Sequence, residues 1–224
     1  MALTFSILDW KAWTPAQHDA QPDVSVIPAL LRRRLSPIGR AVLSVILPLA
    51  ETHGAMPLVY VSRHGDLNRT LGLLEELAKN EPMSPTAFSL SVHNATAGLF
   101  SIQQGLTNNI TALSGGACEL VPGLLESLGL CSAQTPQVLC VFCDETPPPI
   151  YRHQVDQPAQ PYALAVVIGM GDGWQLINCG QRDAAIAVVP EPQALQLLQL
   201  LQEEGRELLL AHNGSNWQLL RCPL

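Results

Sequence analysis

The chain has 224 residues, of which 47% are hydrophobic and only 14% are charged, and its formal net charge is −7. This length and apolar content allow one good core, or one domain with an appendage. The negative charge argues against nucleic acid as a partner, and the low charge content suggests that another chain covers part of the surface.

Neither a membrane span nor an export signal is expected. The apolar stretch over residues 41–50 suits a buried helix and is too short to cross a bilayer. The N-terminal "MALTFSILDW" has no basic start and reaches Asp9 too early for a signal peptide. The six cysteines are therefore expected to be free thiols in a reducing cytoplasm.

The pair Cys140 and Cys143 has the C-x-x-C spacing of redox and zinc motifs, but it lies in the apolar run "VLCVFCDE". Positions three apart on a strand face opposite ways, so the two thiols cannot meet on a strand. A buried strand is the favoured interpretation.

The first half of the chain alternates apolar strands with helices. Four leucines, Leu67, Leu71, Leu74 and Leu77, recur at helical spacing and predict an amphipathic helix. In chain order the expected elements are a strand over 3–13, a short helix, a break at Ser36-Pro37, a strong helix ending at Gly54, a buried strand over 56–63, the amphipathic helix over 66–80, short helices over 81–92 and 95–105, and a strand over 109–113.

The remainder of the chain begins with the tight turn Ser114-Gly115-Gly116. It is expected to continue with a helix over 118–130, a buried strand over 136–145, a Pro-rich connection over 147–161, strands over 162–171 and 173–180 around a Gly-Asp-Gly turn, a helix over 191–205 and a strand over 216–222. Helices alternate with buried strands up to residue 144, which predicts an α/β fold with a largely parallel sheet.

Residues 109–130 have the order strand, sharp turn, helix, by which several enzyme families hold a reactive Ser or Cys at a helix N-terminus. The residue at the tip is either Ala117, which has no reactive group, or Cys118, which has one. An inert packing cysteine is the favoured interpretation of Cys118. His93 is a candidate base, although a histidine bonded to backbone in a tight loop is favoured.

Three segments in this order, "VSRHGDLNRTLGLLEELA", "SPTAFSLSVHNATAG" and "TALSGGACELVPGLLES", resemble the N-terminal half of β-ketoacyl synthases. More closely, they resemble the ketosynthase-like chain-length factors of type II polyketide and aryl polyene pathways. The resemblance covers residues 25–145. It implies a thiolase-like α/β half-fold over residues 1–146, the Pro-rich connection over 147–161, and a truncated second half over 162–224.

The resemblance also assigns positions around the turn. The family's Asn-x-x-Ala-Gly and Gly-Leu segments correspond to Asn94, Ala97, Gly98, Gly105 and Leu106. Counting forward without a gap places the nucleophile position on Ala117. Cys118 would then lie one residue further into the helix, with its thiol turned about 100° away.

The catalytic histidines of the family lie in His-Gly-Thr and Gly-His contexts, and neither context occurs in this sequence. His153 lies in the Pro-rich connection, and His212 is followed by Asn-Gly. A thiol nucleophile needs a base or an electropositive setting to form thiolate. The resemblance therefore implies a protein without a catalytic activity of its own, which needs neither cofactor nor metal.

By this resemblance the chain is expected to be a cytoplasmic, non-catalytic partner of a full-length ketosynthase in a heterodimer. The strand Asn109, Ile110, Thr111, Ala112 and Leu113 would pair with the same strand of the partner across a two-fold axis. Leu99, Phe100 and Leu106 would shape the floor of the partner's acyl tunnel.

Four arginines, Arg32, Arg33, Arg34 and Arg40, cluster in an otherwise acidic chain. They predict a docking patch for an acyl carrier protein or for its phosphopantetheine phosphate, or else a solvated helix face paired with local carboxylates. Two other functions stay open. One is an acyl-transfer enzyme that uses Cys118 as nucleophile with His93 or His153 as base, and the other is a scaffold or homodimer without an acyl ligand.

Overall fold

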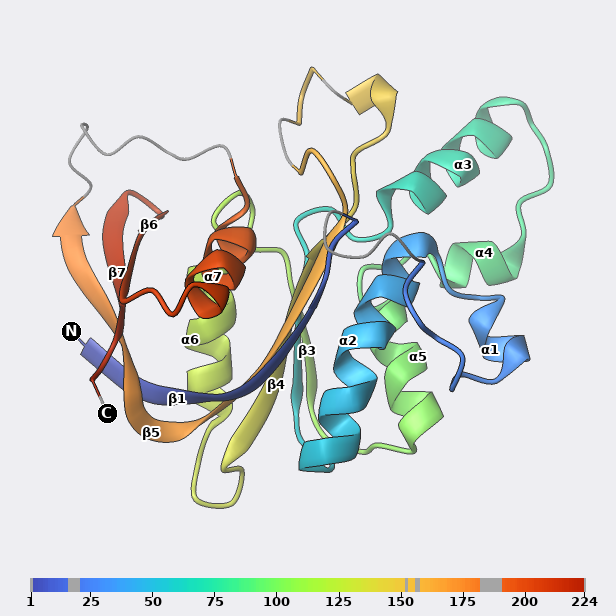
Figure 1. The fold of residues 1–224 in the computed structure, drawn as a ribbon. Coiled ribbons are helices and arrows are strands. Elements are labelled where there is room, and N and C mark those ends of the chain that lie inside the picture. Colours follow the sequence, from blue (N-terminus) through green and yellow to red (C-terminus); the bar gives the residue numbers. More distant parts are fainter. Residues whose placement is uncertain (1, 16–20, 152, 156–157, 182–190, 224) are drawn as a thin grey trace.

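A computed structural model describes residues 2–15, 21–151, 153–155, 158–181 and 191–223. In these residues one seven-stranded sheet lies between two layers of helices (Figure 1). The strand order is β3-β2-β4-β5-β7-β6, and β1 pairs with β5 outside this path. The strands are β1 (Ala2–Trp13), β2 (Leu58–Val61), β3 (Ile110–Leu113), β4 (Gln137–Asp144), β5 (Tyr162–Gln181), β6 (Glu207–His212) and β7 (Ser215–Arg221).

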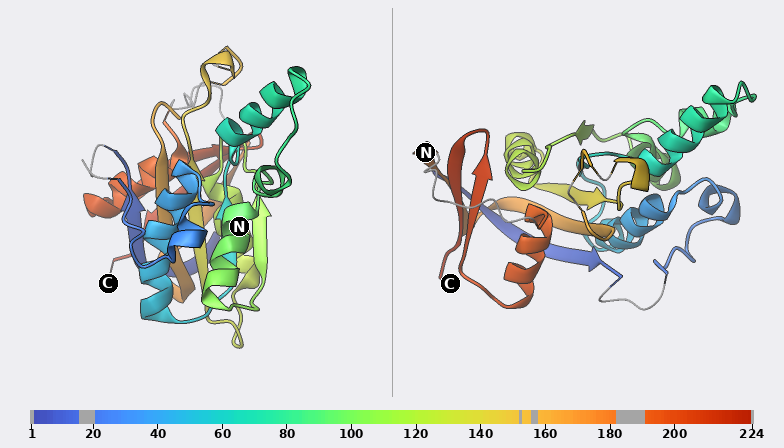
Figure 2. Two further views of the ribbon diagram at one scale, coloured as in Figure 1. Left: turned by 90° about the vertical axis from the view of Figure 1, so that its right-hand side faces the viewer. Right: turned by 90° about the horizontal axis from the view of Figure 1, so that it is seen from above.

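The helices cover both faces of this sheet. They are α1 (Ala29–Arg32), α2 (Pro37–His53), α3 (Leu67–Ala78), α4 (Pro85–Ser89), α5 (Ala95–Gln104), α6 (Leu120–Leu130) and α7 (Gln193–Gln202), with a 3₁₀ turn at Pro149–Tyr151. Helices α2 and α5 pack on one face, and α6 and α7 on the other (Figure 1). Helices α1, α3 and α4 form a separate group to one side (Figures 1 and 2). No helix in the described residues is long and apolar enough to cross a bilayer.

Strand β4 lies at the centre of the core, because its side chains are buried on both faces of the sheet. Cys143 packs in the cluster under α2 and α5, whereas Cys140 packs in the cluster under α6 and α7. Both thiols are fully buried, which confirms the buried-strand interpretation of the C-x-x-C spacing. A Cβ added to Gly123 of α6 would come 2.5 Å from the Phe142 ring, so glycine lets this helix approach the sheet closely.

The predicted α/β fold is confirmed, but the sheet is mixed rather than mostly parallel. Strand β2 is parallel to β3 and to β4, whereas the other strand pairs are antiparallel. Residues 147–161 connect β4 to β5, and these two strands are antiparallel neighbours in the same sheet. The division into an N-terminal half, a connection and a truncated second half stays a prediction.

Strand β5 corrects the expectation of two strands around a Gly-Asp-Gly turn. It runs without a break through Gly171 and Gly173, pairing with β4 before this point and with β7 after it. The glycines pass closely over β1, where the register shifts between Phe5 and Ser6, and a Cβ on Gly171 would collide with the Ser6 Oγ. Glycine here allows the close approach of two strands, which sequence spacing alone does not distinguish from a turn.

Strand β6 was missed by the sequence analysis, although a signal for it exists. It forms a hairpin with β7, closed between His212 and Ser215 by the turn Asn213-Gly214. Both turn residues have positive φ, 47° and 74°, as a two-residue type I′ turn requires. The dipeptide Asn-Gly between two apolar runs is the usual sequence mark of such a hairpin.

Candidate functional site

The parallel strands β3, β2 and β4 all end on the same side of the molecule. The carboxyl ends of parallel strands are the usual place for a functional site in such sheets. Three loops converge there: residues 62–66 after β2, residues 114–119 after β3, and the residues after Asp144 of β4. We call residues 114–119 the elbow turn. The Ser114 hydroxyl donates to the Arg63 carbonyl at 3.1 Å and ties the elbow turn to the loop after β2.

The elbow turn depends on its two glycines. Gly116 has φ of 62°, and a Cβ on Gly115 would lie 2.6 Å from the Glu119 Cα. Helix α6 begins at Leu120, so the expected start at Cys118 is wrong. Cys118 is a partly buried residue of the turn, and the helical geometry expected to turn its thiol away does not apply. Ala117 lies exposed at the tip.

Glu119, the last residue of the elbow turn, is a buried acid that the sequence analysis did not identify. Its Oε1 accepts the Ala194 backbone N–H of α7 at 3.0 Å and the Tyr162 hydroxyl at 3.5 Å. Burial raises the pKa of Glu119 to about 7, and the hydrogen bond from Ala194 opposes this rise only in part. The carboxyl group therefore links the turn to the N-terminus of a helix from the C-terminal part of the chain.

Asp144 holds the loop after β2 in place. Its carboxylate accepts the Ser62 hydroxyl at 2.8 Å and the backbone N–H groups of Arg63 and His64, both at 3.0 Å. Burial raises the pKa of Asp144 although these three donors favour the charged form. All three donors belong to the loop after β2, so Asp144 has a structural role here.

The structure separates the histidines by role. His93 donates from Nε2 to the Ser62 carbonyl at 2.9 Å and stands perpendicular to the Tyr60 ring, which confirms the interpretation as a loop histidine. His153 is exposed in the Pro-rich connection. His212, at the end of β6, lies against the Cys118 backbone; burial lowers its pKa, and hydrogen bonding to that backbone partly opposes the change. Sequence context gave no sign of this long-range contact.

Strand β3 is an edge strand of the sheet, as the predicted pairing with a partner requires. The carbonyls of Asn109 and Leu113 accept the backbone N–H groups of Leu58 and Ser62. Because strand residues alternate in direction, the N–H and C=O groups of Ile110 and Ala112 point away from β2. Within the described chain these groups have no ladder partner, although pairing with another subunit stays a prediction.

The residues expected to shape an acyl tunnel lie in the chain's own core. Phe100 is 1% exposed and Leu99 is also buried, and Leu106 packs against the same cluster. The large apolar residue of α5 that is exposed is Ile102, with 76% of its area accessible. This burial favours a core role for Phe100 and Leu99, and a role in a partner's tunnel stays a proposal.

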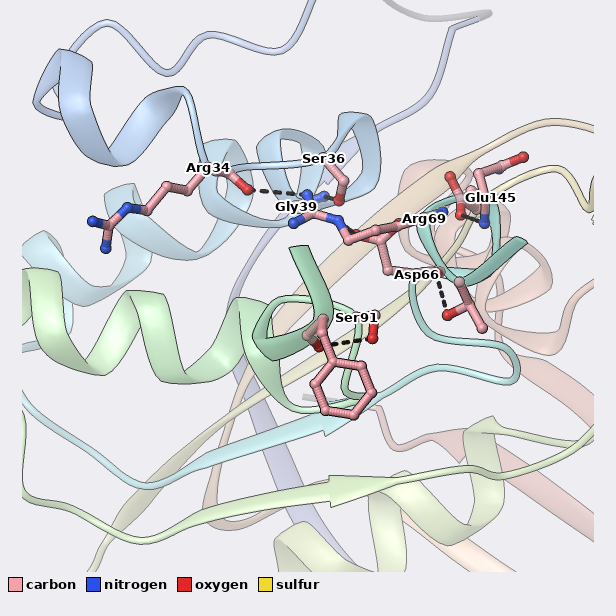
Figure 3. Close-up of polar contacts among 10 residues, drawn as sticks. Arg34, Ser36, Gly39, Asp66, Arg69, Ser91 and Glu145 are labelled. Atoms are coloured by element: carbon pink, nitrogen blue, oxygen red, sulfur yellow. Dashed lines mark hydrogen bonds and ion pairs between the residues drawn. The ribbon is translucent and has the colours of Figure 1, made fainter. Parts of the chain in front are cut away.

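The four predicted arginines lie around the end of α1 and the start of α2. Among the described residues their side chains form no ion pair, so the alternative of local carboxylate pairing is not supported. A fifth arginine, Arg69, joins them: its Nη2 donates to the Arg34 carbonyl at 3.0 Å, and its Nε pairs with Asp66 at 3.0 Å (Figure 3). The sequence analysis did not include Arg69 in this cluster, because Arg69 lies at least 29 residues beyond the other four arginines.

The described residues contain no group of three or more His, Cys, Asp or Glu side chains placed to hold a metal ion. Two surface pockets among the described residues lie away from the elbow turn. One is lined by Arg206 and Arg221 near the end of the chain, and another by His53 and Met56 at the amino ends of the parallel strands. The first pocket also contains Glu204 and Cys222, and neither pocket includes a residue of the elbow turn.

Comparison with known proteins gives one family and several solved structures. The family described as "Beta-ketoacyl synthase, N-terminal domain" matches residues 9–219. A chain of the structure "Ketosynthase (ApeO) in Complex with its Chain Length Factor (ApeC)" from Xenorhabdus doucetiae is 28% identical, with a TM-score of 0.85, and the match covers 98% of this chain and 100% of that one.

Two more distant structures share the fold. The ishigamide ketosynthase/chain length factor is 14% identical, with a TM-score of 0.60, over 80% of this chain and 67% of that chain. A β-ketoacyl synthase from Burkholderia phymatum STM815 is 12% identical, with a TM-score of 0.56, over 75% of this chain and 52% of that chain. These likenesses show the thiolase-like α/β half-fold. A search of curated proteins gave no match.

Proposed function

Because the chain belongs to the family of β-ketoacyl synthase N-terminal domains, we propose that it is a non-catalytic, chain-length-factor-like partner of a ketosynthase. The reaction served would be chain elongation of the polyketide or fatty-acid type, with aryl polyenes as the expected product class. The observation that carries this proposal is the exposed Ala117 at the tip of the elbow turn, where no side chain can attack a thioester. The likeness to the ApeO–ApeC structure supports a ketosynthase as the partner.

The acyl-transfer alternative keeps one supporting observation. His212 lies against the Cys118 backbone, and burial lowers its pKa, which favours the neutral imidazole that a general base needs. His212 is a better candidate base than His93, because the Nε2 of His93 already donates to the Ser62 carbonyl. In this alternative Cys118 would be the nucleophile and His212 its base.

Replacing Cys118 with alanine separates the two functions. In the non-catalytic proposal the Cys118→Ala variant should give at least half of the wild-type product in a reconstituted or cellular assay, because the thiol takes no part in the reaction. The measurement is product yield by mass spectrometry, with the His212→Ala variant assayed alongside. A fall to the level of a strain that lacks the protein, with the variant folded, would establish the acyl-transfer alternative.

The edge of β3 is proposed as the centre of the contact with the ketosynthase. Neighbouring elements carry exposed apolar side chains: Phe88 on α4, Ile102 on α5, and Val92 between these two helices. Figure 2 shows α4, α5 and β3 along the same side of the molecule. Large exposed apolar groups beside an unpaired strand edge are typical of an interface.

A proline at Ala112 tests this contact without breaking the chain's own sheet. The Ala112 N–H points away from β2, so Ala112→Pro removes a donor that only a partner strand could use. We expect the variant to keep its thermal midpoint within about 3 °C and to lose at least tenfold in affinity for the ketosynthase, since ladder bonds and strand fit are both lost.

The matched control is Ala112→Val, which keeps the N–H and should bind as the wild type does. Affinity is measured by titration of the purified ketosynthase encoded in the same gene neighbourhood. Unchanged affinity of a folded Ala112→Pro variant would show that β3 does not pair with the partner.

The arginines are proposed to receive an acyl carrier protein. Arg33 and Arg34 are exposed, and no described carboxylate pairs with them. An acidic protein surface or a phosphate group would satisfy them. A cytoplasmic location is part of the same proposal, because the partners of such a protein are cytoplasmic enzymes.

A further inference from the structure

The far half of helix α3 carries an apolar face that the described chain does not cover. Leu74 is 47% exposed, Leu77 is 57% exposed, and Met83 just beyond the helix is also exposed. Leu73 is the buried residue of this helix. The sequence predicts an amphipathic helix, and such a stripe normally packs on a core. Here only part of it finds a partner within the chain.

The near end of α3, by contrast, is anchored by polar contacts (Figure 3). The Asp66 carboxylate accepts the Arg69 N–H at 3.4 Å and pairs with the Arg69 Nε at 3.0 Å. Glu145, at the end of β4, accepts the Asn68 N–H at 2.9 Å. Arg69 also donates to the Arg34 carbonyl at 3.0 Å. These bonds fix the direction of the helix without any burial of its far leucines.

The exposed face continues towards the edge of β3. Helix α4, which packs against α3, carries the exposed Phe88, and Val92 and Ile102 follow along the chain. In the left-hand view of Figure 2, α3, α4, α5 and β3 lie along one side of the molecule. The apolar side chains therefore extend the surface proposed for the ketosynthase, away from the strand edge.

We propose that the α3–α4 arm, residues 67–89, is a second docking surface for the same ketosynthase subunit that pairs with β3; this rests on the proposed function. A stable interface buries roughly 800 Å² on each partner, which a strand of four residues does not supply alone. Glu75, Glu76 and Glu81 flank the exposed leucines and outnumber the nearby Lys79. The matching surface of the partner is apolar with a basic rim.

The arm should be the part of the chain that complex formation orders most. A helix of twelve residues with one buried side chain has little local stability of its own. Amide hydrogen exchange of residues 67–89 should slow at least tenfold in the complex, alongside slower exchange over residues 109–113. Peptides from β6, at the opposite edge of the sheet, should not change.

The decisive variant is Leu74→Glu combined with Leu77→Glu. Both side chains are exposed, so the fold should be retained, while affinity for the purified ketosynthase should fall at least tenfold. The control is Leu209→Glu on β6, a similarly exposed leucine at 55%, which should bind as the wild type does. Circular dichroism and thermal unfolding of the free variants check the fold.

Each outcome has a separate meaning. Tight binding by the double variant, or protection confined to residues 109–113, overturns the arm as a docking surface and leaves the proposed function standing. Absence of any complex with the wild-type chain overturns the proposed function and the arm together. Weakened binding by Leu209→Glu as well would show a general effect of added charge and would also overturn the specific role of the arm.

Discussion

Phe100→Ala is expected to lower the free energy of unfolding by about 3–5 kcal/mol, the usual cost of removing a fully buried aromatic ring. Phe100 is 1% exposed and packs in the cluster formed by α2, α5 and one face of the sheet. Removal of the ring leaves a cavity among the side chains of α2 and β2 in this cluster. Urea unfolding of the purified chain measures the change.

Ile102→Ala on the same helix is the control, because Ile102 is 76% exposed and its loss should change stability by no more than about 0.5 kcal/mol. The mass distribution of products is measured for the Phe100→Ala variant in the presence of the ketosynthase. A stable Phe100→Ala variant that shifts products to longer chains would restore the acyl-tunnel role assigned to Phe100 by resemblance.

Glu119→Gln is expected to stabilise the protein at pH 8 and to leave it nearly unchanged at pH 5. The pKa of Glu119 is about 7 in the folded chain, above its ordinary value of 4.5, because burial disfavours the charge. The folded state therefore holds this proton more tightly than the unfolded state. The resulting stabilisation is present below about pH 4.5 and is lost as the pH rises through 7.

The pKa of Glu119 is about 7 in the folded chain and 4.5 in the unfolded chain. This difference corresponds to a loss of folding stability on the order of 3 kcal/mol between pH 4.5 and pH 8. Glutamine keeps an oxygen to accept the Ala194 N–H and cannot ionise, so most of this loss should disappear in the variant. Burial also raises the pKa of Asp144 and of Glu145, so a smaller fall in the same direction should remain.

Thermal and urea unfolding at several pH values between 5 and 8 test this prediction, with Glu51→Gln on the exposed side of α2 as the control. A Glu119→Gln variant that is less stable than the wild type at pH 8 would mean that the carboxylate charge at the N-terminus of α7 is itself stabilising. Such a result would assign the favourable helix dipole, rather than burial, as the larger effect.

Local signals in the sequence determined most elements and their order. The break at Ser36-Pro37 marks the start of α2, where the Ser36 Oγ accepts the Gly39 N–H at 3.2 Å. The apolar run of β4 and the strand expected over residues 109–113 are also found. These features depend on caps, turns and spacing within a few residues, which a sequence displays directly.

Tertiary structure alone decided which distant residues meet, because such contacts follow from strand pairing and from burial rather than from spacing. It joined Glu119 to Ala194 across 75 positions and brought His212 to Cys118. It also buried Phe100, which the resemblance had placed at a partner's tunnel, and left Leu74 and Leu77 of the amphipathic helix exposed. Periodicity shows that a helix has an apolar face, but only the packed chain shows whether that face is covered.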